Sequence, residues 1–144
     1  MSRSGRPSID RDDERGAHAV QRLVSARVIW LTTVDPDGMP QTSPVWFLWA
    51  GDEFLVYSLD SPRASNVSEH PEVSLNLDGN GMGGDIVVIE GRARIDRSAP
   101  SAAENEDYLA KYGPVMDERG WSPEWFAGRY SVPIRIAATK YRYW

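Results

Sequence analysis

The sequence of 144 residues contains no cysteine and only two histidines, which limits the chemistry open to it. Without cysteine there is no disulfide, no thiolate metal ligand and no cysteine nucleophile. His18 and His70 lie far apart in the sequence and match no metal-binding spacing such as H-E-x-x-H, so we expect no metal site. A chain without cysteine is compatible with a reducing compartment, and we expect a cytoplasmic protein.

The sequence also lacks a long hydrophobic run and an excess of basic residues. Its longest apolar stretch, VWFLWA at 45–50, is far shorter than the roughly 20 residues that span a bilayer. Sixteen Lys and Arg against 21 Asp and Glu give a net charge of −5, with no block of either sign. Nucleic-acid binding generally needs a basic face. We therefore expect neither a membrane span nor a nucleic-acid partner, and an OB-like barrel with stacking tryptophans is disfavoured.

The length of the chain fits a single domain with one substantial core. The first residues, MSRSGRPSIDR, include no apolar segment of the kind found in secretory signals. We expect residues 1–11 to form a flexible N-terminal segment and residues 12–144 to form the folded domain.

Most of the chain is expected to form strands. Short runs rich in β-branched and aromatic residues predict strands at 27–34, 41–49, 53–59, 72–77, 85–95 and 130–144. The first three are joined by short turns and predict an antiparallel meander. Helical patterns cover 12–25, a short stretch after Ser61, the region beyond Ser98 as far as Tyr112, and 122–127.

This order of elements predicts a mainly β fold with peripheral helices, in which an antiparallel sheet curls into a barrel. A Rossmann fold is disfavoured because the glycines at 79–84 precede a strand, whereas a dinucleotide-binding loop follows a strand and opens a helix.

The segment DSPRASN at 60–66 predicts a helix that begins with an anion-binding turn. Ser61 is a natural N-cap and Pro62 suits the first helical position, which places Arg63 in the first turn. Free main-chain N–H groups and the helix dipole favour an anion there, and a guanidinium matches phosphate oxygens. The alternative is a capped surface helix whose Arg63 pairs with Asp60 or Glu69.

Three motifs resemble those of a known family: G-x-P-x-x-x-P-V-W-F at 38–47, S-x-R-x-x-N at 61–66 followed by HPEVSL, and the ending RYSVPIRI…W. The chain is similar to the pyridoxamine-5′-phosphate-oxidase-like split β-barrel family. More narrowly, it resembles the actinobacterial flavin and deazaflavin oxidoreductases that use coenzyme F420. The resemblance runs from about Asp12 to the C-terminus and implies an antiparallel split β-barrel that forms a homodimer with two cofactor sites between the subunits.

Carried over by position, the resemblance implies where a cofactor binds. The ring would lie against the backbone of four consecutive residues, Ser43, Pro44, Val45 and Trp46. Tyr57 and Ser58 would line the ribityl chain, and Arg63, with Asn66 nearby, would face the phosphate.

The sequence departs from the oxidases that make pyridoxal phosphate. Those proteins carry an arginine-lysine pair where this chain has Pro62-Arg63, an arginine at the position of Ser43, and a C-terminal Arg-x-His that is absent from KYRYW. These departures argue against vitamin B6 oxidation and tight FMN binding, and they favour coenzyme F420, whose longer tail offers more places to be held.

We therefore expect an F420-dependent oxidoreductase that passes a hydride between the deazaflavin and a small conjugated substrate. The alternatives are an FMN-dependent enzyme of the same fold and a non-catalytic protein that holds a flavin-like or haem-like ligand. The cofactor carries such chemistry itself, so no catalytic triad is needed, and no acid-base residue is identified.

Several tryptophans and arginines are further candidates for the site. Trp121 and Trp125 would either line the substrate pocket or pack at the dimer interface, and Trp144 would pair in a strand or reach the partner's groove. Isolated arginines at 129, 135 and 142 would meet the cofactor tail or remain solvated.

Overall fold

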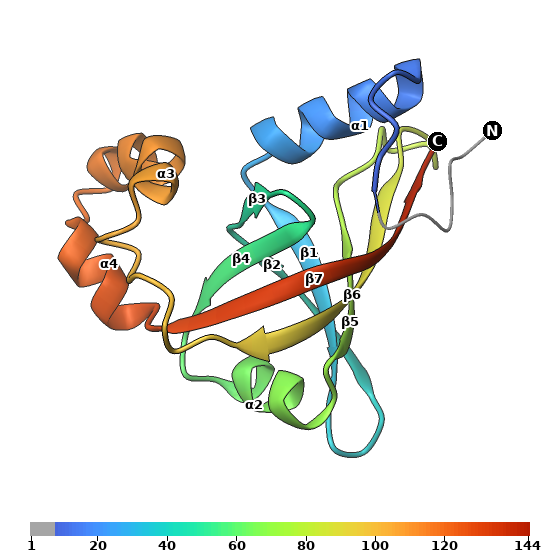
Figure 1. The fold of residues 1–144 in the computed structure, drawn as a ribbon. Helices are drawn as coiled ribbons and strands as arrows, with labels where there is room; N and C mark the ends of the chain where they lie inside the picture. Colours follow the sequence, from blue (N-terminus) through green and yellow to red (C-terminus); the bar gives the residue numbers. More distant parts are fainter. Residues whose placement is uncertain (1–7) are drawn as a thin grey trace.

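The computed structural model describes residues 8–144, which fold around one seven-stranded antiparallel sheet (Figure 1). The strands run in the order β2-β1-β5-β6-β7-β4-β3. Their bounds are β1 Ile29–Val34, β2 Pro40–Val45, β3 Leu48–Ala50, β4 Glu53–Ser58, β5 Glu72–Asn76, β6 Val87–Ile95 and β7 Val132–Tyr143. The helices are α1 Glu14–Ser25, α2 Pro62–Glu69, α3 Glu106–Glu118 and α4 Pro123–Arg129. The mainly β architecture with peripheral helices, predicted from the sequence, is confirmed.

The hairpin of β1 and β2 has the predicted turn. Ile29 pairs with Val45 at one end and Val34 with Pro40 at the other. The Asp35 carboxylate accepts hydrogen bonds from the backbone N–H groups of Asp37 and Met39, at 2.9 Å each, which closes the turn. A short polar side chain that bonds the backbone a few residues ahead is a common way to fix such a turn.

The predicted strand 41–49 and the three-strand meander are wrong. The strand breaks at Trp46 and Phe47, so β2 and β3 lie at opposite edges of the sheet, and β4 pairs with β3 and β7. The Tyr112 hydroxyl lies 2.9 Å from the Phe47 nitrogen and 3.0 Å from its carbonyl oxygen. The Phe47 carbonyl also accepts from Lys111 Nζ at 3.0 Å. Because side chains of α3 satisfy both backbone groups, Phe47 needs no strand partner and the chain can cross from one edge to the other.

The helix ends also differ from the prediction. The α1 helix begins after Asp13, whose carboxylate accepts from the Gly16 N–H at 3.2 Å. The α3 helix begins at Glu106, capped by Asn105, and continues through Pro114, whereas the sequence predicted a helix beyond Ser98 that ended at Tyr112. The segment between β6 and α3 instead forms turns. The predicted flexible segment 1–11 lies mostly outside the described residues, and within it Ile9 packs against the core.

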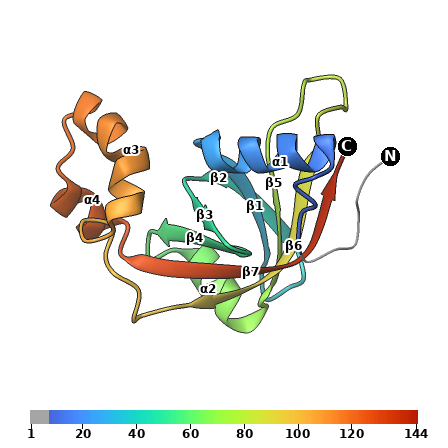
Figure 2. The same ribbon diagram turned by 45° about the horizontal axis from the view of Figure 1, so that its top comes forward.

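Two hydrophobic clusters lie on opposite sides of β4. Phe54 and Val56 belong to the cluster inside the curled sheet, whereas Leu55 and Tyr57 belong to a second cluster with α3 and α4. Both faces of this strand are therefore covered, which explains why it does not show a half-exposed alternation. Figures 1 and 2 show α3 and α4 together beyond one end of the sheet, α1 across its top and α2 beneath it.

Candidate functional site

The first turn of α2 has the predicted cap residue but not the usual capping bond. Ser61 is the N-cap and Pro62 the first helical residue. The Ser61 carbonyl accepts from the N–H groups of Ala64 at 3.0 Å and Ser65 at 3.3 Å. The Ser61 hydroxyl is buried and has no hydrogen-bond partner within residues 8–144. A buried hydroxyl without a partner is costly, so a ligand that bonds to it would recover free energy.

Arg63 is held in place by two serine hydroxyls. Its guanidinium donates to Ser43 Oγ, from Nη2 at 2.8 Å and from Nε at 3.2 Å, and to Ser58 Oγ from Nη1 at 3.1 Å. Burial lowers the pKa of Arg63, and nearby Tyr130 acts in the opposite direction. An arginine nevertheless stays protonated in proteins. The serines accept from three of its five N–H groups and leave its positive charge uncompensated.

The predicted alternative, in which Arg63 pairs with Asp60 or Glu69, is not present. No carboxylate of the described residues forms an ion pair with this guanidinium. A half-buried cation without a counter-ion normally costs free energy, because its solvation is reduced and no anion offsets the loss. The arrangement is typical of a position prepared for an external anion.

Arg63 lies on the wall of a cavity of about 390 Å³ between the sheet, α2 and the α3–α4 pair. The lining combines aromatic rings, two arginines and no acidic residue: Val28, Pro44, Val45, Trp46, Tyr57, Leu59, Arg63, Arg119, Trp121, Phe126 and Tyr130. A volume of this order is suited to a small organic ligand or part of a cofactor. The two cations are notable in a chain with a net charge of −5.

The aromatic wall is built around Trp46. Its ring stacks on Tyr112, with centroids 4.5 Å apart and planes within 3°, and on Phe126 at 5.3 Å. Trp121 lies at 6.2 Å from it with a tilt of 37°. Because Tyr112 and Phe126 are buried, they fix the orientation of Trp46 in the lining of the cavity.

The structure brings together most of the predicted site residues. Pro44, Val45, Trp46, Tyr57 and Arg63 line the cavity, whereas Ser43 and Ser58 stand behind them as acceptors for Arg63.

Asn66 is the exception among the predicted site residues, because its amide faces the β1–β2 hairpin. Its Nδ2 donates to Thr33 Oγ1 at 3.1 Å and to Gln41 Oε1 at 3.2 Å. It does not line the cavity. The assignment of all eight residues to a cofactor stays a prediction.

Tyr57 contributes its ring to the cavity, but its hydroxyl is engaged elsewhere. The hydroxyl donates to the Pro100 carbonyl at 2.7 Å and accepts from Asn105 Nδ2 at 3.1 Å. Burial raises the pKa of Tyr57, and the hydrogen bond from Asn105 and the charge of Arg135 partly offset this. Tyr57 is therefore a neutral, fixed wall and not a proton donor poised near neutrality.

The sequence analysis missed Arg119, Phe126 and Tyr130. Phe126 and Tyr130 are four residues apart on and just after α4, a spacing that places both rings on one face. That spacing was the available signal. For Arg119 the signal was its place before Gly120 and Trp121, a common composition for a helix end.

The remaining candidates from the sequence are three tryptophans and three isolated arginines, and only Trp121 among them lines the cavity. Trp121 lines the cavity as one prediction proposed, while the half-exposed Trp125 contacts Trp121 at 5.3 Å without lining it. Two of the isolated arginines are ion-paired: Arg135 with Asp96 at 2.7 Å, and Arg142 with Glu90 at 3.4 Å.

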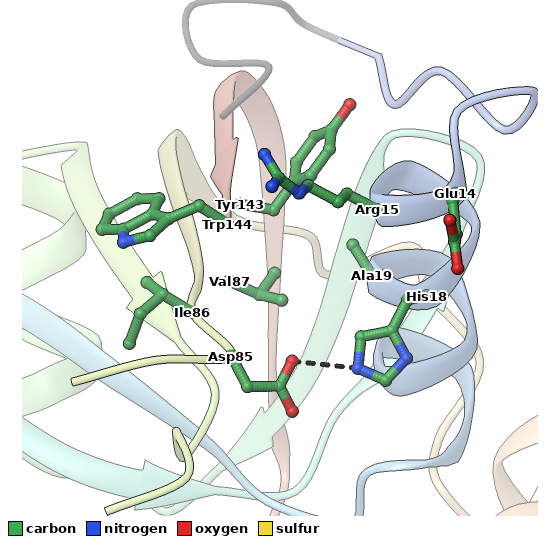
Figure 3. A pocket seen from close by; sticks show the side chains of 9 residues that line it. All are labelled: Glu14, Arg15, His18, Ala19, Asp85, Ile86, Val87, Tyr143 and Trp144. Atoms are coloured by element: carbon green, nitrogen blue, oxygen red, sulfur yellow. Dashed lines mark hydrogen bonds and ion pairs between the residues drawn. The ribbon is translucent and has the colours of Figure 1, made fainter. Parts of the chain in front are cut away.

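A second pocket, of about 340 Å³, lies between α1 and the end of β7 (Figure 3). Figure 3 shows His18 and Asp85 facing each other, with 2.9 Å between Nε2 and Oδ1. Trp144 lines the same pocket, and its backbone pairs with that of Ile86, which confirms the predicted strand pairing. In contrast to the aromatic cavity, this pocket is lined by acidic and basic side chains together.

Residues 8–144 contain neither a membrane-spanning helix nor a cluster of metal-binding side chains. None of the helices there is long and apolar enough to cross a membrane. No group of three or more His, Asp or Glu side chains in that part of the chain is arranged to hold a metal ion.

Solved structures share this fold at low sequence identity. A conserved hypothetical protein from Mycobacterium tuberculosis is 26% identical, with a TM-score of 0.67 over 88% of this chain and 82% of that one. An F420 reductase is 19% identical, with a TM-score of 0.56 over 83% and 91%. A heme storage protein from Vibrio cholerae is 16% identical, with a TM-score of 0.52 over 83% and 86%.

The search of curated proteins returned no match. The sequence profile described as pyridoxamine 5′-phosphate oxidase, in contrast, matches residues 17–144, which is nearly the whole folded part of the chain. The fold, its split-barrel neighbours and this match agree with the resemblance seen in the sequence motifs. The chain belongs to the pyridoxamine 5′-phosphate oxidase family.

Proposed function

We propose that this protein is an oxidoreductase that binds coenzyme F420 and transfers a hydride between the deazaflavin and a small conjugated organic substrate. The observation that carries the proposal is Arg63, a half-buried cation held by serine hydroxyls on the wall of an aromatic cavity without acidic residues. The similarity in fold to an F420 reductase supports it.

The residues present fit the parts of such a cofactor. Arg63, with the unpartnered Ser61 hydroxyl and the start of α2 beside it, would hold the phosphate. β2 is an edge strand, so alternate backbone groups along Ser43, Pro44 and Val45 face away from β1 and can bond the polar edge of a ring.

A deazaflavin supplies the hydride, that is, two electrons with one proton, and the reduced substrate takes a second proton from solvent or a side chain. The chain's own contribution is to bind, orient and exclude water. Trp46, fixed by its stack on Tyr112, gives the flat surface on which a ring is oriented. The hydrophobic second cluster behind it keeps water from that wall.

We further propose a cytoplasmic homodimer in which the second subunit completes the cofactor site. Trp125 contacts the cavity residue Trp121 at 5.3 Å between ring centroids and is 47% exposed in the single chain. A partner subunit that covers this ring would bury it and close the cavity. Light scattering of the purified protein gives the mass directly, and a monomer that binds the cofactor normally would contradict this part of the proposal.

The test of the cofactor is a pair of titrations. Purified protein receives coenzyme F420 and, separately, FMN, and quenching of the ligand's own fluorescence reports binding. We expect binding of coenzyme F420 and weaker binding of FMN, because Arg63 is the only cation that the described residues place beside the phosphate position. A yellow protein that retains FMN through purification would overturn the choice of cofactor.

The test of catalysis is oxidation of the reduced coenzyme, followed by the return of its absorbance, with a series of activated alkenes. Turnover with at least one of them is expected. The similarity to a heme storage protein favours a specific rival, a ligand-holding protein without chemistry. A Soret band after addition of haem, together with no turnover, would support that rival.

A further inference from the structure

We infer that Arg119 and Trp121 form a substrate subsite that takes the carboxylate of a flat, conjugated organic acid. This inference rests on the proposed function, because it assigns the other anion-binding corner of the same cavity to the acceptor of the hydride. It narrows the substrate from any conjugated compound to one that carries a negative charge next to its planar part.

The backbone of Arg119 is held by hydrogen bonds, whereas its guanidinium has no ion-pair partner among the described residues. It caps the C-terminus of α3, where its backbone N–H lies 3.2 Å from the Val115 carbonyl oxygen and 3.1 Å from that of Met116. Its guanidinium carbon sits over the Trp121 ring, 5.2 Å from the centroid. In the part of the chain that the structure describes, no carboxylate forms an ion pair with this side chain, although Asp117 and Glu118 precede it.

This placement leaves the hydrogen-bonding edge of Arg119 available. The guanidinium carbon lies over the Trp121 ring, and none of the guanidinium N–H groups forms a hydrogen bond with another described residue. That edge matches the two oxygens of a carboxylate. Arg63, by comparison, already donates from three nitrogens to Ser43 and Ser58 and is set deeper in the cavity wall.

The aromatic lining favours a flat molecule beside this edge. Trp121 lies 6.2 Å from Trp46 and 6.4 Å from Phe126, with its plane tilted by 37° and 29°. These rings and Arg119 line one cavity, so a ligand that stacks on the rings can reach the guanidinium. In a conjugated acid the carboxylate tends to lie in the plane of the π system, which brings the stacking face and the anionic edge into one rigid unit.

The charge of the cavity supports two anionic groups and not one. Its lining has two arginines, from α2 and from the end of α3, and no acid. A cofactor phosphate at Arg63 neutralises one of them. Arg119 is exposed in the single chain, so water solvates its guanidinium, and the charge remains open to a second anion at the edge of the cavity.

The test compares trans-cinnamate with trans-cinnamamide, which has the same flat skeleton without the charge. Binding is measured by quenching of tryptophan fluorescence, with and without coenzyme F420. We expect the wild-type protein to bind cinnamate about tenfold more tightly, and Arg119→Gln to bring the two affinities together. Arg119→Lys should keep part of the preference, because it keeps the charge but not the planar fork. Arg92→Gln, at an exposed ion pair with Glu72 outside the cavity, is the matched control and should behave like wild type.

The outcomes separate this inference from the proposed function. Equal affinity of the wild-type protein for the two probes, or no binding of cinnamate, would overturn the subsite. So would an Arg119→Gln variant that loses affinity for coenzyme F420 and keeps its preference for cinnamate, since Arg119 would then hold the cofactor tail. A wild-type protein that prefers cinnamate but does not bind coenzyme F420 would uphold the subsite and contradict the proposed function.

Discussion

Two of the pockets in the described part of the chain, the aromatic cavity and the pocket beside α1, have similar volumes of about 390 and 340 Å³ but a different charge balance. The aromatic cavity has two arginines and no acid. The pocket beside α1 has Glu14 and Asp85 together with Arg15 and His18. Where acids and bases meet, the charges offset one another and the fold is held together. Where a half-buried cation such as Arg63 stands without an acid, the anion of a ligand can supply the offset. The balance of charge, more than the volume, distinguishes the candidate functional site.

The arginines of the two regions show the same contrast at close range. Arg22 donates to the carbonyl oxygens of Asp78 and Asp85, and its Nη1 lies 3.5 Å from the Asp85 carboxylate. Its charge is compensated, and the interaction ties α1 to the connection between β5 and β6. Arg63 has hydroxyl acceptors only. The first arginine is therefore a structural clamp, whereas the second is available to an anion.

The largest expected effect comes from giving the aromatic cavity the acid that it lacks. Val45 is 7% exposed and lines the cavity, so Val45→Asp places a carboxylate in the space that Arg63 also faces. This carboxylate would compete with the phosphate and repel it, and we expect more than about a hundredfold loss of coenzyme affinity in the titration.

The matched control is Val45→Asn, because an asparagine side chain has nearly the same shape as aspartate and is polar but carries no charge. Burying either polar side chain should lower the free energy of unfolding by about 1–3 kcal/mol, measured by denaturant unfolding. The aspartate variant should lose far more affinity than the asparagine variant. Equal losses in both would mean that the charge of the cavity does not matter.

A smaller effect is expected when each arginine is removed in turn. Arg63→Ala should weaken coenzyme binding about tenfold to a hundredfold, the equivalent of one charge-assisted contact of about 1.5–3 kcal/mol, with little change in stability. Arg22→Ala should leave affinity unchanged but lower the free energy of unfolding by about 0.5–1.5 kcal/mol, because the carbonyl groups of Asp78 and Asp85 lose the donor that ties them to α1. If the two variants change the same quantity, the contrast between clamp and anion site fails.

The sequence predicted those parts of the site that depend on local chemistry. The β1–β2 hairpin follows from Asp35 and its turn, and the start of α2 follows from Ser61 and Pro62, because each of these residues acts on its immediate neighbours. Arg63 could therefore be placed at a helix mouth from seven residues of sequence.

The parts that were mispredicted or missed depend on distant residues. The break between β2 and β3 is made by Tyr112, whose hydroxyl bonds a backbone 65 positions away. Arg119 reaches the cavity only because α3 continues through Pro114, a residue that ordinarily ends a helix in sequence-based interpretation. The side-chain amide of Asn66 donates to Thr33 and Gln41. The spacing of residues along α2 does not predict these partners, because they lie in the β1–β2 hairpin.

The smallest effect is expected at the pair of His18 and Asp85 in the pocket beside α1. The His18 side chain is 54% exposed and that of Asp85 38%, so water screens their interaction. Exposed pairs of this kind contribute about 0–1 kcal/mol to stability. His18→Gln keeps a group able to bond Asp85, and we expect a change in the free energy of unfolding within that range and no change in coenzyme affinity.

The small effect expected for His18→Gln tests whether the pocket beside α1 binds a ligand. The same titrations are applied to this pocket and to the aromatic cavity, so the two can be compared directly. Asp85→Asn is the complementary change, since it removes the acid and leaves His18 and Arg22 without their carboxylate. If removal of that acid alone created a new affinity for phosphate or FMN, loss of charge compensation would be sufficient to make an anion site. If instead His18→Gln weakened coenzyme binding as much as Arg63→Ala, charge balance would be the wrong criterion for finding the site.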